Sequence, residues 1–184
     1  MSFELQELTN KLIDDAEYLF GNSLGEWLFS GIEINDKPPS LKYYPESGEV
    51  TISLSKKIIG DNRQLIFQLS HEVCHLLHPS LEFPSLYQNQ TLVINEGLST
   101  YFSILKTQEY FDQGEFLIDN LKTYSTNYFN AYNLVKDLID KDTNSIKKLR
   151  AVKPRIDRLV LEDFAKADLY YELQFINKLV QGFK

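Results

Sequence analysis

The sequence predicts a single α+β domain in which a small sheet is followed by a mostly helical body. Three observations indicate this class. The chain has 184 residues, a length that suits one domain with a sizeable core. Residues 31–55 favour β-branched and alternating apolar side chains between segments of turn chemistry. On both sides of this region, apolar residues recur at the spacing of an α-helix.

The N-terminal third of the chain predicts one helix and then the sheet. Apolar positions recur at helical spacing over residues 3–20, and Gly21 and Asn22 end the pattern. Three stretches are typical of strands and are separated by the turn segments DKPP and PESG: GIEIN, LKYY and EVTISLS. We therefore expect a small antiparallel sheet of two or three strands, with a hairpin at PESG.

The helical body is predicted to begin at Asp61, a good N-cap, and Pro79 is expected to end its first helix. The segment HPSLEFPSLYQNQ has the composition of a loop, after which Thr91 is expected to cap a second helix. Helical patterns cover about 92–111, 115–140, 143–152, 154–166 and 168–182, with Pro154 at a helix start. We expect about 1–112 to form a core and about 113–184 to form a helical C-terminal subdomain of the same domain.

Composition argues against several classes of protein. The net charge is −7 and the lysines are scattered, so we expect no nucleic-acid binding. The sequence has no run of about 18 apolar residues and no basic segment ahead of an apolar one, so we expect neither a membrane span nor a secretion signal. The single cysteine, Cys74, cannot form an internal disulfide, which suits a reducing compartment. We expect a cytoplasmic protein, and the sequence does not indicate its oligomeric state.

All three histidines of the chain lie in the stretch FQLSHEVCHLLHP, residues 67–79. His71 and His75 are one helical turn apart, so their side chains project from the same face and can hold one metal ion. Imidazole ligands suit Zn²⁺, and Glu72 can reach a water on that ion as a general base. His78 lies a turn beyond and is expected to border the site rather than bind the ion. The alternative is a solvated polar face that carries histidines incidentally.

A third ligand is predicted in the stretch TLVINEGLSTYFS, residues 91–103, where Glu96 lies on a largely apolar helix. A carboxylate in apolar surroundings is costly unless it is paired or binds a cation. Small neighbours at Ser99, Thr100 and Ser103 would let this helix approach the histidine helix. Alternatively, Glu96 is a surface residue or pairs with a lysine. Weaker candidates for the third ligand are Glu82, Glu109 and Asp112, whereas Cys74 is expected to pack as a small hydrophobe.

The pair of motifs H-E-V-C-H and N-E-G-L-S-T-Y resembles the gluzincin metallopeptidases, which include thermolysin-like and aminopeptidase-like enzymes. The resemblance covers about residues 50–105. It implies a zincin-like fold, one Zn²⁺ per chain held by His71, His75 and Glu96, and Glu72 as the base that activates a zinc-bound water. It also implies that EVTISLS is the sheet edge along which a peptide substrate adds as a strand.

This sequence departs from the pattern of such enzymes at several positions. Thr100 stands where thermolysin-like enzymes often have an aspartate that supports a zinc-binding histidine, so another group must orient His71 or His75. The glutamate-bearing motif of the large aminopeptidases is not evident. Leu81 stands where the metzincin proteases have a third histidine, and the only methionine is Met1, so the metzincin pattern fails.

A hydrolase of this type also needs a group that stabilises the oxyanion formed during peptide hydrolysis. Tyr124, Tyr128 and Tyr132 recur at four-residue steps, and we take Tyr128 as the first candidate, although a tyrosine stripe more commonly packs against a core. Arg150 and Arg155 are weaker candidates. The sequence therefore predicts a zinc-dependent metallopeptidase that acts on a peptide or protein. The alternative is a non-catalytic or latent zincin-like zinc-binding module that acts through a protein partner, and a non-peptide metallohydrolase would share the same residues.

Overall fold

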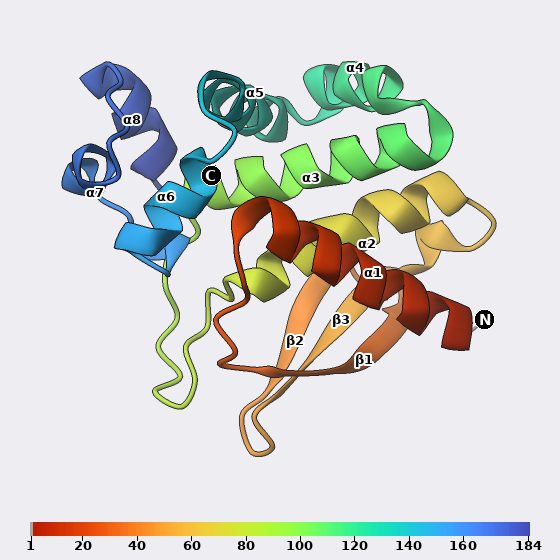
Figure 1. Cartoon of the computed structure of the whole chain (residues 1–184). Helices are drawn as coiled ribbons and strands as arrows, with labels where there is room; N and C mark the ends of the chain where they lie inside the picture. The colour runs from red at the N-terminus through yellow and green to blue at the C-terminus, as the bar shows by residue number, and fades with distance from the viewer. Residues whose placement is uncertain (1) are drawn as a thin grey trace.

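The computed structural model describes residues 2–184, with side chains from residue 4 onward, so Met1 lies outside it. The described chain is α+β, with eight α-helices and a mixed three-stranded sheet (Figure 1). The strands are β1 (Leu28–Asn35), β2 (Ser40–Tyr44) and β3 (Glu49–Ser55). The helices are α1 (Ser2–Phe20), α2 (Asn62–Leu77), α3 (Val93–Phe111), α4 (Gly114–Tyr124), α5 (Thr126–Lys141), α6 (Ser145–Val152), α7 (Leu161–Lys166) and α8 (Leu173–Val180). Two short 3-10 helices, η1 (Lys56–Ile58) and η2 (Ile156–Arg158), complete the list.

The sheet has the order β1-β3-β2, so the prediction of an antiparallel sheet is wrong for one of its two pairings. β2 and β3 form the predicted antiparallel hairpin, whose turn ends at Gly48 with a φ of +70°, a conformation that favours glycine. β1 instead runs parallel to β3. β3 is the central strand and five of its seven residues are buried, whereas the residues of β1 and β2 are exposed or half-buried, as is typical of edge strands.

The helices cover the sheet in successive layers, as Figure 1 shows. α2 packs against β3 and β2, with α1 beside it, and α3 lies on the other side of α2. α5 packs on α3, and α6, α7 and α8 close one end. One hydrophobic cluster runs through these layers, from Leu12 in α1 to Leu179 in α8. None of the described helices has the length and hydropathy needed to cross a membrane.

Local capping explains where the two central helices begin. The side chain of Asp61 accepts hydrogen bonds from the backbone N–H groups of Arg63 and Gln64, which confirms the predicted N-cap of α2. The prediction for α3 is wrong by one residue, because Leu92 rather than Thr91 is its N-cap. The Asn95 side chain supplies the cap from inside the helix, since its Oδ1 accepts the Leu92 N–H at 3.2 Å.

The C-terminal half is helical as predicted, with three differences. The helix expected over 168–182 is the shorter α8, Leu173–Val180. The single helix expected over 115–140 is two helices, α4 and α5, separated at Ser125. The helix expected over 154–166 is reduced to η2 and α7, and Pro154 does not begin a helix. Lys153, the residue before the proline, is extended, as that position favours, and the buried Arg155 then holds the following backbone in place through ion pairs.

Candidate functional site

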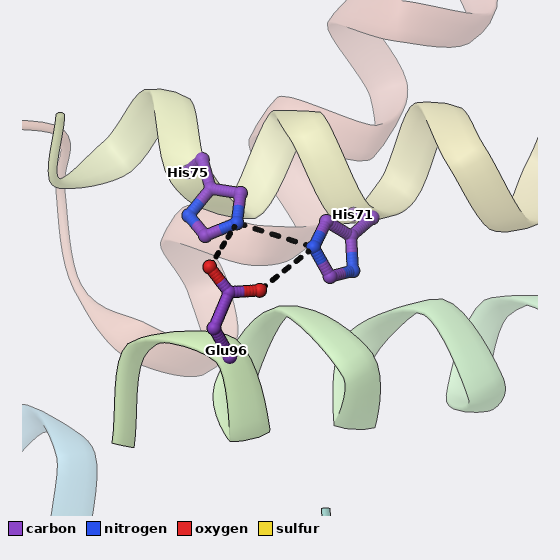
Figure 2. A group of neighbouring side chains, drawn as sticks. All are labelled: His71, His75 and Glu96. Carbon is purple, nitrogen blue, oxygen red and sulfur yellow. Dashed lines mark hydrogen bonds and ion pairs between the residues drawn. The ribbon is translucent and has the colours of Figure 1, made fainter. Parts of the chain in front are cut away.

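The facing helices α2 and α3 bring His71, His75 and Glu96 together, although Glu96 lies 21 residues beyond His75 in the sequence. Figure 2 shows the two imidazoles projecting from one helix toward the carboxylate of the other. The Nε2 atoms of His71 and His75 are 3.1 Å apart. Glu96 places Oε2 at 3.3 Å from the His71 Nε2 and Oε1 at 3.5 Å from the His75 Nε2.

These separations fit a shared cation. Tetrahedral zinc has bonds of about 2.0–2.2 Å to nitrogen and oxygen, which places neighbouring ligand atoms about 3.3–3.4 Å apart. The two imidazole nitrogens lie 3.1 Å apart, and each lies 3.3 or 3.5 Å from one of the two oxygens of Glu96, which are close to that value. Moreover, Oε2 of Glu96 is buried and accepts no hydrogen bond from a described residue, and it faces the His71 Nε2. Within residues 2–184, this is the one group of at least three potential ligands whose atoms converge within 4.8 Å.

Burial and charge act on the same three groups. Burial alone would raise the pKa of Glu96, but the charges of His75 and His71 and their contacts with the carboxylate hold that pKa well below its usual range. Burial would lower the pKa of His75, yet the adjacent Glu96 raises it above the ordinary histidine value. In the absence of a metal ion, the carboxylate of Glu96 and the imidazole of His75 therefore stabilise each other as an ion pair.

Glu72 borders this group from the next position on α2. Its side chain is only 4% exposed and hydrogen-bonds to no described residue, and it lines the same cavity as His71 and His75. Burial raises the pKa of Glu72, and the neighbouring histidines offset this only in part. Its carboxylate is not among the fully buried polar atoms that lack a partner, so it is open to the cavity beside the two histidines.

A cavity of about 630 Å³ opens over these residues. One wall comes from α2 and α3, a second from Leu121, Ser125 and Tyr128 of the α4–α5 region, and a third from Ser40, Leu41 and Tyr43 of β2. The edge strand at the cavity is therefore β2. The expectation that EVTISLS forms this edge is wrong, because both sides of β3 are already paired.

The three tyrosines at four-residue steps occupy different surroundings. Tyr128 lines the cavity, with its ring 6.1 Å from that of His71 and 4.8 Å from that of Phe183. Burial and the nearby carboxylates of Glu96 and Glu72 raise the pKa of Tyr128 to about 12. Its hydroxyl thus remains a proton donor at any physiological pH. Tyr124 is 82% exposed, and Tyr132 is buried against Tyr101 in a separate cavity.

The remaining candidates lie outside the converging group. His78 is buried, and burial lowers its pKa well below the ordinary value; its Nε2 is 3.9 Å from the Sγ of Cys74, which is also buried. The weaker third-ligand candidates all have other partners: Glu82 pairs with Arg155 and Arg158, Glu109 with Lys106, and Asp112 with Gln108. Arg150 holds the backbone carbonyls that follow α1, and Arg155 pairs with Glu26.

Two functional positions were not predicted from the sequence, namely Gly97 and Asn95. Gly97 allows α3 and α5 to touch, because a Cβ at this position would lie 2.6 Å from Cγ2 of Val135 and closer still to the Ala131 carbonyl. The signal was a glycine inside an otherwise apolar helical pattern. Asn95 is 2% exposed and lines the cavity beside Glu96. Only its place three residues after the N-cap of α3 indicated a special role.

A group that would orient His71 or His75 by accepting a hydrogen bond from its second ring nitrogen is not found among the described residues. Thr100 is fully buried and its hydroxyl has no hydrogen-bond partner there. The one hydrogen-bond contact of either histidine side chain with a described residue is the mutual contact of their Nε2 atoms, and both also face Glu96. No described residue therefore accepts a hydrogen bond from Nδ1 of His71 or His75.

Comparisons with known protein families, with curated proteins and with solved structures found no match to this chain. The residues around the cavity are therefore the basis on which a function is assigned.

Proposed function

We propose that this chain is a zinc-dependent peptidase with a zincin-like arrangement of its site, in which His71, His75 and Glu96 hold the metal. The observation that carries the proposal is the convergence of two imidazole nitrogens and one carboxylate, with contacts of 3.1–3.5 Å among them, at a cavity that Glu72 also lines. Two imidazoles and one carboxylate are the ligand types that catalytic zinc takes.

The position of Glu72 supports catalysis rather than a purely structural metal. A structural zinc site is closed by four protein ligands, whereas a catalytic one has three and keeps an open position. Three ligands converge among the described residues, and they do so at the wall of a cavity. A structural site does not require a carboxylate next to its ligands and open to the cavity, and Glu72 is such a group.

Each residue then has a distinct role in peptide hydrolysis. A bound zinc ion supplies a Lewis acid, which polarises the peptide carbonyl and lowers the pKa of water. Glu72 takes up the proton of the attacking water at its carboxylate and passes it to the leaving amine. The raised pKa of Glu72 suits this double role, because the group must both gain and release a proton. Tyr128 donates its phenolic hydrogen to the carbonyl oxygen as negative charge develops there.

One observation favours the alternative, a non-catalytic or latent zinc-binding module that acts through a protein partner. Zinc-binding histidines usually donate their second ring N–H to a carboxylate or carbonyl, and no described residue accepts one here. Such support raises the basicity of the ligands. A site without it binds zinc more weakly, which suits a module whose metal is retained only in a complex.

Cleavage of a degenerate peptide library by the zinc-loaded protein, read by mass spectrometry, separates the two functions. We expect cleavage by the wild type and a loss of about 10²–10⁴-fold in Glu72→Gln with its zinc content unchanged. Glu109→Gln is the matched control, since Glu109 is half-exposed on α3 and pairs with Lys106. A zinc-loaded wild type that cleaves no peptide, or a Glu72→Gln variant as fast as the wild type, would overturn the peptidase and leave the binding module.

A further inference from the structure

Asn95 presents an unused hydrogen-bond donor to the cavity. Its side chain is buried and lines the cavity one residue before Glu96. The Oδ1 atom accepts the Leu92 N–H, which fixes which end of the amide faces the backbone. The amide nitrogen therefore points elsewhere, and it donates to no described residue. The helix cap of α3 thus holds an –NH₂ group in one orientation beside the proposed ligand.

The other amide side chains in the cavity lining are already engaged. Gln68 accepts the Ser55 N–H and directs its nitrogen at Gln64, and the nitrogen of Gln88 donates to the Ser80 hydroxyl at 2.9 Å. Asn95 is consequently the buried amide of this lining whose donor is free. This nitrogen is not among the fully buried atoms that lack a partner, so it is open to the cavity, where a ligand that supplies an acceptor can meet it.

The lining also indicates the kind of acceptor. It contains no lysine or arginine, and its acidic members among the described residues are Glu72 and Glu96. No lysine or arginine of the lining would therefore pair with a carboxylate on the ligand, and only the metal could do so. A neutral carbonyl, in contrast, is matched by a single amide donor. Peptides supply such a carbonyl at every residue.

We propose that Asn95 binds substrate by donating its side-chain N–H to a main-chain carbonyl next to the bond that is cleaved. This inference rests on the proposed peptidase function and adds to it a preference for peptide segments without a carboxylate at this point. It makes Asn95 a substrate-binding residue whose position is set by the cap of the very helix that carries Glu96.

Asn95→Asp tests the inference with little change to the fold, since the carboxylate still accepts the Leu92 N–H but offers no donor. Binding to the zinc-loaded protein is measured by calorimetry for two ligands, acetohydroxamate and a hydroxamate that carries two amide-linked apolar residues. Both meet the metal, but only the second has peptide carbonyls. Gln88→Glu is the matched control, because it adds a charge to the same cavity without removing a free donor.

We expect Asn95→Asp to keep its zinc and its affinity for acetohydroxamate relative to Gln88→Glu, and to lose about tenfold or more in affinity for the peptidyl hydroxamate. If the aspartate variant does not fold, an alkene isostere of the ligand that lacks the carbonyl should bind the wild type with the same loss. Equal losses for both hydroxamates, or an isostere that binds as well as its parent, would overturn the role of Asn95. These assays read binding alone, so they are distinguishable from a failure of the cleavage assay.

Discussion

At the scale of single residues, Glu72 lies where it suits the proposed catalysis but lowers the stability of the metal-free protein. Its carboxylate is buried next to two histidines and has no hydrogen-bond partner among the described residues. A group whose pKa is raised on folding contributes stability that is fully present below its unfolded pKa and is lost as the pH rises through the folded pKa. The charge of Glu72 therefore destabilises the metal-free protein at neutral pH.

Glu72→Gln should stabilise the metal-free protein while it abolishes cleavage. The free energy of unfolding, measured with urea in the presence of a chelator, should exceed that of the wild type by more at about pH 8 than at about pH 5. The reason is that the wild type loses stability as the pH rises from the unfolded to the folded pKa of Glu72, whereas glutamine does not titrate. Glu109→Gln removes an exposed charge and should show a much smaller dependence on pH. A Glu72→Gln variant less stable than the wild type at both pH values would contradict this placement.

Tyr128→Phe should reduce kcat by about 10²-fold, since one donor to a developing oxyanion contributes on this order. Zinc content should not change, because the hydroxyl is not part of the converging group. Tyr124→Phe and Tyr132→Phe are matched controls on the same stripe, one exposed and one in a separate cavity. Steady-state kinetics of the three variants on one peptide checks the prediction, and equal effects in all three would remove Tyr128 from the site.

At the scale of elements, Gly97 sets the distance between α3, which carries Glu96, and α5, which carries Tyr128. Alanine is the better helix former by about 1 kcal/mol, but its methyl group would press on the Ala131 carbonyl, which is backbone and cannot turn away. We expect Gly97→Ala to lower the free energy of unfolding by about 1–3 kcal/mol, as measured with urea. Gly114→Ala should cost less, because the added methyl meets only the flexible side chain of Gln108. Equal stability of the two variants would show that α3 and α5 can separate freely.

Elements governed by local chemistry were predicted well from the sequence. The Asp61 cap, the PESG hairpin and the loop after His78 follow from residues close in the chain, and all three are confirmed. The pairing of β1 could not be predicted in this way. Whether β1 joins β2 or β3 depends on which strand the helices bury, and β3 takes the centre because α2 covers it. For the same reason, the prediction that β3 forms the sheet edge at the cavity was wrong.

The candidate site was likewise predicted only where it depends on residues close in the chain. Helical spacing predicted that His71 and His75 share a face, and the structure brings Glu96 to them from a separate helix. The amide of Asn95 and the close approach at Gly97 escaped notice, because their importance lies in contacts across space: a cap that fixes a side chain, and a neighbouring helix. The sequence marks Gly97 only as a glycine within an apolar helical pattern, and the contacts themselves cannot be inferred from spacing.

At the scale of the whole molecule, Arg155 joins segments that are distant in the chain. It donates to both carboxylate oxygens of Glu26 at 2.8 and 2.7 Å, to the Pro79 carbonyl at 2.6 Å and to Asp157 at 3.3 Å. The segment after α6 is thereby tied to the start of the sheet and to the loop after the histidine helix. The hydrophobic cluster likewise includes residues from both halves.

Arg155→Lys should therefore destabilise the entire chain rather than its C-terminal part alone. A lysine cannot reproduce the planar fork that meets several acceptors, and acidic groups would be left buried and poorly paired. We expect a loss of about 2–4 kcal/mol in one cooperative urea transition, read by circular dichroism and by tryptophan fluorescence. Arg158→Lys, at a half-exposed position, should cost less than about 1 kcal/mol. Two separated transitions in the wild type would contradict a single domain.

The central claim is that α2 and α3 together hold one zinc ion, and metal content tests it most directly. The protein would be loaded with zinc, passed through a desalting column and assayed by elemental analysis beside His71→Ala, Glu96→Gln and Glu109→Gln. We predict about one zinc ion per chain in the wild type and in Glu109→Gln, and a loss of most of it in the other two variants. A wild type that retains no zinc, or a Glu96→Gln variant that retains as much as the wild type, would contradict the claim.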